Sequence, residues 1–155
     1  PLQLFAPVLR AVGVLLAALL LGAGSVSLAQ EEPQTDRERA RENARSNTGE
    51  LTDEGYVVRG DSWSGEAMSG GRVGIRHQLF KGNEYVFTLG TGIEADIEFG
   101  IFTKERKAVP GEIGEGEQNA SMRINPAKTG TYLIVFSLTS EEDERIPWAL
   151  VYAYR

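Results

Sequence analysis

The sequence lacks cysteine, has a single histidine and is poor in positive charge. Without cysteine, disulfide bonds, thiolate metal sites, a thiol nucleophile and a lipid-modified N-terminal cysteine are all excluded, so core packing alone must stabilise the fold. With only His77, the nitrogen ligands of a typical zinc hydrolase are missing. The 22 Asp and Glu outnumber the 16 Lys and Arg, the net charge is −6, and no basic run occurs. This balance argues against nucleic acid or an anionic membrane as a partner.

One long hydrophobic run is present, near the start of the chain. Residues 11–29 follow Arg10, consist mostly of Ala, Val, Leu and Gly, and end in Ser-Leu-Ala. A short apolar core followed by small residues is typical of a secretory signal peptide with an Ala-x-Ala-like cleavage site. The sequence therefore predicts a signal peptide over residues 1–29 and a periplasmic or secreted protein with no stable membrane insertion after cleavage. The alternative is an uncut anchor, but the strongest part, 11–21, is shorter than the roughly 20 apolar residues that span a bilayer.

A polar tract follows over residues 30–50 and contains no large apolar side chain. Such a tract buries too little surface to order itself and is expected to be a disordered linker. Alternating charge over 36–45 would support a frayed helix, and a partner-docking helix is the functional alternative. Because no apolar stripe is present with which to dock, we favour a spacer.

From residue 51 onward, short runs of aromatic and β-branched residues alternate with polar ones between turn-forming clusters. Strands are predicted over 55–59, 62–68, 72–80, 85–89, 96–102, 120–124, 131–138 and 148–154, with an exposed loop over 111–118 and a loop opening at Gly90-Thr91-Gly92. Four apolar rows should meet in the core: Tyr85, Phe87 and Leu89; Ile97, Phe99 and Ile101; Tyr132, Ile134, Phe136 and Leu138; Trp148, Leu150, Tyr152 and Tyr154. One-sided rows are typical of antiparallel sheets with one wet face. Residues 51–155 are therefore expected to form an all-β domain, an antiparallel, jelly-roll-like β-sandwich of about seven to nine short strands, with a closed barrel as the alternative.

Four segments resemble, in order and spacing, the bacterial pre-peptidase C-terminal domain, a small jelly-roll-like β-sandwich of exported proteins. They are HQLFKGNEYVFTL (77–89), EADIEFGIF (94–102), NPAKTGTYLIVFS (125–137) and the closing WALVYAY (148–154). The resemblance implies a binding or accessory role without catalytic residues. It also implies an exported peptidase or an envelope polymer as a partner, and it makes calcium a ligand to test.

Three carboxylates are the candidate metal ligands. Glu94, Asp96 and Glu98 are spaced two apart, so on a strand they point to one face. A hard cation such as Ca²⁺ would relieve their repulsion, and the acidic loop 141–144 would add ligands if it folds nearby. The ordinary alternative is a solvated sheet face that keeps the protein soluble and discourages edge pairing. The same cluster is also the candidate carboxylate pair for glycoside hydrolysis.

A serine hydrolase is the other catalytic hypothesis. Residues 60–64, Gly-Asp-Ser-Trp-Ser, resemble the nucleophile block of Gly-Asp-Ser-Leu-type lipases and esterases. Ser62 would then need His77 as its base. The Asp-x-x-His block of those enzymes is absent, and so is the pattern of a parallel sheet with helices, so no catalytic residue is expected.

Among the aromatic residues, Trp63 is the candidate for surface binding, because it lies in a polar, glycine-rich stretch, whereas Trp148 heads an apolar row. The sequence as a whole predicts an exported, non-catalytic binding module whose ligand is a protein segment, a polysaccharide or calcium. The alternatives are a small exported hydrolase that uses Ser62 and His77 or the Glu94, Asp96 and Glu98 cluster, and a structural subunit of an envelope assembly.

Overall fold

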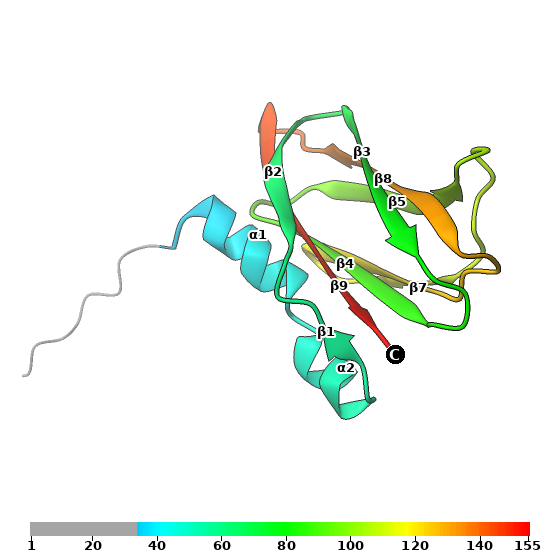
Figure 1. Ribbon diagram of the computed structural model, residues 1–155. Coiled ribbons are helices and arrows are strands. Elements are labelled where there is room, and N and C mark those ends of the chain that lie inside the picture. The colour runs from blue at the N-terminus through cyan, green and yellow to red at the C-terminus, as the bar shows by residue number, and fades with distance from the viewer. Residues whose placement is uncertain (1–33) are drawn as a thin grey trace, which may run out of the picture. The chain divides into compact units, whose positions relative to one another are not determined.

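The computed structural model describes residues 34–155, which form two facing β-sheets and two short helices (Figure 1). The predicted signal peptide lies outside these residues. The helices are α1 (Asp36–Ala44) and α2 (Thr48–Asp53). The strands are β1 (Val57–Val58), β2 (Trp63–Met68), β3 (Arg72–Leu79), β4 (Tyr85–Thr91), β5 (Asp96–Thr103), β6 (Glu112–Glu115), β7 (Asn119–Ile124), β8 (Gly130–Thr139) and β9 (Arg145–Tyr154).

The two sheets differ in size, and every strand pair in them is antiparallel. The large sheet has the order β1-β9-β4-β7-β6, with β2 pairing along the same edge of β9 as β1. The small sheet has the order β3-β8-β5. From β2 to β6, and again from β7 to β9, each connection crosses from one sheet to the other. The predicted antiparallel β-sandwich is therefore confirmed.

The four predicted apolar rows meet between the sheets and form a single core cluster. Phe87 and Leu89 of β4 and Phe136 and Leu138 of β8 are at most 1% exposed. Trp148 lies edge-on to Phe136, with ring centroids 4.9 Å apart. The period-2 pattern therefore predicts the core correctly. It misses β6, which lies inside the predicted exposed loop and pairs with β7 although all its side chains are exposed.

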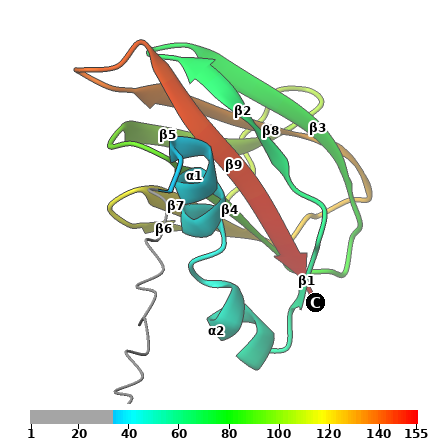
Figure 2. The ribbon, with the colours of Figure 1, turned by 90° about the vertical axis from the view of Figure 1, so that its left-hand side faces the viewer.

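The prediction of a disordered linker over residues 30–50 is wrong for the residues that the structure describes. Helix α1 begins with a capping box, in which the Thr35 side chain accepts from the Glu38 backbone N–H and the Glu38 side chain accepts from Thr35 N–H. The helix lies against the outer face of the large sheet, over β4 and β9 (Figure 2). Ala40 and Ala44 are buried there against Ala149 and Val151. The helix docks through small residues, which is why the sequence shows no stripe of large apolar residues that would predict the docking.

Two glycines of the predicted loop make this close packing possible. Gly90 lies within β4, and a Cβ there would overlap the backbone of Ala40 and Ala44. A Cβ on Gly92 would overlap the backbone of Asp36. Polar contacts complete the docking. The Arg39 side chain donates to Gly92 O at 3.1 Å, and the Asn43 side chain donates to the carbonyl of Thr91 at 2.7 Å.

A second cluster covers the rest of this outer face. Leu51 of α2 and Tyr56 are buried against Val86 of β4 and Ala153 of β9. The Tyr56 hydroxyl donates to Glu84, and the guanidinium of Arg155 lies 4.6 Å from the Tyr56 ring centroid.

Between residues 34 and 155, no helix has the length and apolar character needed to cross a membrane.

Replacing Gly90 by alanine should separate α1 from the large sheet, because the added methyl group overlaps helix backbone that cannot move aside within the docked state. We expect a loss of about 1–3 kcal/mol in the free energy of unfolding. Urea denaturation measures this loss, and faster hydrogen exchange of the α1 amides identifies its place. Gly74→Ala is the matched control, since a Cβ there meets nothing within 4 Å. That variant should be neutral or stabilised by about 0.4–1 kcal/mol. Equal stability of both variants would contradict the docking argument.

Candidate functional site

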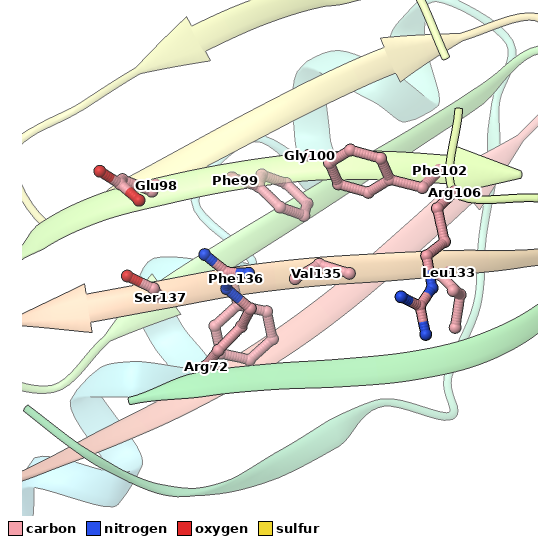
Figure 3. Close-up of a pocket in the computed structure, with 10 residues that line it drawn as sticks. All are labelled: Arg72, Glu98, Phe99, Gly100, Phe102, Arg106, Leu133, Val135, Phe136 and Ser137. Atoms are coloured by element: carbon pink, nitrogen blue, oxygen red, sulfur yellow. The ribbon is translucent and has the colours of Figure 1, made fainter. Parts of the chain in front are cut away.

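The outer faces of the two sheets are unlike each other. Helices cover the outer face of the large sheet, whereas no described residue packs over the centre of the small sheet. Seven residues on the outer side of the small sheet and in the turn after β5 are called here the Phe102 face: Arg72, Arg76, Glu98, Phe102, Arg106, Leu133 and Val135. A hollow of about 460 Å³ opens on this face (Figure 3).

Strand register removes side chains from one row of this face. Gly74 of β3 and Gly100 of β5 both stand opposite Val135 of β8, so two of the three positions in this row have no side chain. The Phe102 ring folds over Gly100, where a Cβ would lie 3.0 Å from the ring edge. Above Gly74 there is only open space. A glycine inside a strand weakens it and often marks a place where a ligand or another backbone approaches closely.

Three arginines belong to the Phe102 face, and two of them, Arg72 and Arg106, line its hollow. Arg72, Arg76 and Arg106 are exposed, and none of them lies within 4.0 Å of a carboxylate in the described part of the chain. Figure 3 shows the guanidinium groups of Arg72 and Arg106 on either side of Val135. Arg106 has φ 63°, the left-handed conformation that non-glycine residues rarely adopt. The face therefore combines apolar surface with unpaired positive charge on an acidic protein, and Glu98 is the carboxylate at its rim.

A second cavity, called here the His77 pocket, also has a volume of about 460 Å³. It is lined by Arg59, His77, Gln78, Phe80, Asn83, Tyr85, Tyr152 and Tyr154. His77 points inward from β3, and its ring centroid lies 4.7 Å from that of Tyr152 and 5.1 Å from that of Trp63. Aromatic rings thus form most of the wall of this pocket.

Burial governs the titration of the two central groups of the His77 pocket. It lowers the pKa of His77, and the nearby Arg59 acts in the same direction while Asp61 opposes both. Burial likewise raises the pKa of Tyr152, with the Asp61 carboxylate adding to the effect. Burial therefore favours the neutral form of His77, in which one ring nitrogen is a donor and the other an acceptor.

The structure does not join the predicted catalytic residues. Among the hydrogen bonds of residues 34–155 there is none between Ser62 and His77. Ser62 lies in the exposed segment before β2, and His77 packs against aromatic rings instead.

The three predicted calcium ligands are divided between two cavities. Asp96 and Glu98 do share the outer face of β5, as the alternation predicts. Glu94 and Asp96 line a polar cavity together with residues 141–143 of the acidic loop, so this loop does fold near two of the three carboxylates. Glu98 lines the Phe102 face instead. Within residues 34–155, no group of three or more His, Cys, Asp or Glu residues could hold a metal ion.

The remaining candidate, Trp63, is a partly buried neighbour of the His77 pocket. Its ring packs against His77 and Tyr152, so it forms no separate exposed platform. Sequence reasoning did not find Arg59, Phe80 or Arg106, because the strands that bring them to the two cavities are far apart in the chain. Leu133 and Val135 did carry a signal, since they are apolar at positions that a one-sided strand would make polar.

Neither the family models nor the curated proteins with which the chain was compared include a match. Among solved structures, the chain is similar to PliG of Aeromonas hydrophila, a periplasmic lysozyme inhibitor of g-type lysozyme. The two are 15% identical, the TM-score is 0.44, and the match covers 66% of this chain and 90% of that one.

The lowered pKa of His77 should make stability depend on pH. The unfolded chain, in which the pKa of histidine is about 6.5, binds the proton more readily than the folded one. The free energy of unfolding should therefore fall as the pH drops through about 6.5 toward the folded pKa, and level off below it. Urea titrations of the wild type and His77→Gln between about pH 7.5 and 5 measure the contribution. On acidification, the free energy of unfolding of the wild type should fall more than that of His77→Gln. A constant difference would contradict the burial argument.

Calorimetry tests the divided carboxylates. Because no three of them converge within residues 34–155, we expect no saturable heat on titration with Ca²⁺ up to about millimolar concentration, the range of weak extracellular sites. Saturable binding that disappears in Asp96→Ala would restore the calcium hypothesis.

Proposed function

We propose that this chain is an exported, non-catalytic binding module that holds a protein segment on its Phe102 face. The observation that carries the proposal is the uncovered apolar hollow with unpaired arginines on either side of it. Most exposed faces of antiparallel sheets are polar, and an apolar hollow open to solvent is a common mark of a binding surface.

The chemistry of the face selects an acidic segment that also carries an apolar side chain. Phe102, Leu133 and Val135 offer the floor on which an apolar side chain loses its contact with water. Guanidinium groups bind carboxylates with two parallel hydrogen bonds, and Arg72 and Arg106 have no such partner within the described residues. The open row at Gly74 lets the bound segment approach the sheet backbone closely.

The wider setting is part of the same proposal. The signal-peptide pattern of residues 1–29 sends the module to the periplasm or outside the cell, and the resemblance to the pre-peptidase C-terminal domain supports an accessory role. The partner is then another exported protein, an exported peptidase among them. Polysaccharide or calcium as the principal ligand, a hydrolase and a structural envelope subunit are the alternatives that experiments must separate.

A peptide array tests the proposal. The folded protein should select peptides in which Asp or Glu lies beside an aliphatic or aromatic residue, and binding should weaken as salt is raised. In the double variant Arg72→Glu, Arg106→Glu, the affinity for the selected peptides should fall by about tenfold or more, because two attractions become repulsions. Arg41→Glu is the control, since Arg41 is also an exposed arginine but lies in α1, on the other sheet.

Three results would overturn the proposal. One is selection of basic or uncharged peptides, and another is an equal effect of the control and the double variant. The third is an absence of peptide binding together with self-association that the double variant abolishes, which would favour a structural subunit.

A further inference from the structure

The His77 pocket is a second concave site, built independently of the Phe102 face. It collects side chains from five parts of the chain: the segment before β2, strand β3, the turn that follows it, and strands β4 and β9. Its volume of about 460 Å³ lies within the range of small-molecule sites. A core defect would be closed to solvent, but Phe80 at its rim is 53% exposed.

The walls of the pocket are flat and aromatic. The Tyr85 and Tyr154 rings lie 6.1 Å apart between centroids, and His77 stands edge-on to Tyr152. Rings held in such contacts keep a fixed orientation, because each neighbour restricts the rotation of the next. The pocket therefore presents pre-organised ring surface to a ligand with a flat apolar side.

Hydrogen-bonding groups line the same space and lack protein partners. Neither the ring nitrogens of His77 nor the hydroxyl of Tyr154 makes a hydrogen bond to a described residue. They are absent from the buried unpaired atoms of residues 34–155, so solvent reaches them. An entirely apolar ligand would strip water from these groups without replacing its hydrogen bonds, which is unfavourable. The ligand must therefore carry hydroxyl or amide groups.

The pocket has little net charge to offer. No carboxylate lines it, and the guanidinium of Arg59 forms an ion pair with Asp61 at 3.1 Å. His77, Gln78, Asn83 and the tyrosines supply neutral donors and acceptors. This is unlike the Phe102 face, whose arginines are unpaired. An ionic ligand gains little here, whereas a neutral polyhydroxylated one finds a hydrogen-bond partner for each polar edge.

We propose that the His77 pocket binds a neutral saccharide unit. One face of a sugar ring lies against the exposed Phe80 and the tyrosine rings, and its hydroxyl groups exchange hydrogen bonds with His77, Tyr154 and the amide of Gln78. The volume of about 460 Å³ accommodates a sugar ring. The two sites together would let the module hold an exported protein beside a polymer.

The test uses the folded protein and an array of neutral and acidic oligosaccharides. We expect neutral members to bind, and the best of them to change the fluorescence of Trp63, whose ring contacts His77 and Tyr152. Phe80→Ala and His77→Gln should each weaken this binding by about tenfold or more. Ile113→Ala is the matched control, because Ile113 is a similarly exposed apolar residue, 59% accessible, on β6.

Each other outcome overturns the proposal. No binding anywhere on the array would do so, as would binding that Phe80→Ala and His77→Gln leave unchanged. Binding of acidic members alone that is lost in the Arg72→Glu, Arg106→Glu protein would assign the ligand to the Phe102 face. If no saccharide binds but peptides do, and Phe80→Ala abolishes the peptide binding, the pocket takes a peptide side chain instead.

Discussion

The fold depends on burying both faces of the two central strands of the large sheet. Without disulfides, the chain must be stabilised by packing, and β4 and β9 are buried along almost their whole length. The small sheet covers one side of them and the helices cover the other. This arrangement uses all the covering elements between residues 34 and 155, so the small sheet has only one face protected. The exposed outer face is thus a consequence of where the helices are needed.

The two cavities follow from this asymmetry in different ways. The Phe102 face lies on the uncovered side, where side chains are free to differ from the polar average. The His77 pocket lies at one end of the sandwich, where residues of β3, β4 and β9 meet the segment before β2. Their polarity differs accordingly. One has three arginines without carboxylate partners in the described chain, and the other pairs its single guanidinium with Asp61. Two ligands of different chemistry are therefore compatible with one small domain.

Period-2 alternation is a reliable guide to this fold because each strand has one face in the shared core, as the rows of β4, β5, β8 and β9 illustrate. The docking of α1 was not predicted, because this helix packs through Ala40 and Ala44 close to glycine and needs no large apolar side chains. The capping box at Thr35 and Glu38 was the readable signal of its start. The sites are harder to predict. Arg72 and Arg106 are brought together only by the pairing of β3 and β5 with β8, and alternation does not specify which strands become neighbours.

The place of β9 in the chain affects how the molecule is made. This strand follows all the others, yet it is the shared neighbour of β1, β2 and β4. As a ribosome produces the chain, those earlier strands have no central partner until residues 145–154 emerge. Pairing over such long separations is slow, because the loops must close before any contact is gained. The large sheet can therefore be completed only at the end of synthesis, when the strand that joins its two sides becomes available.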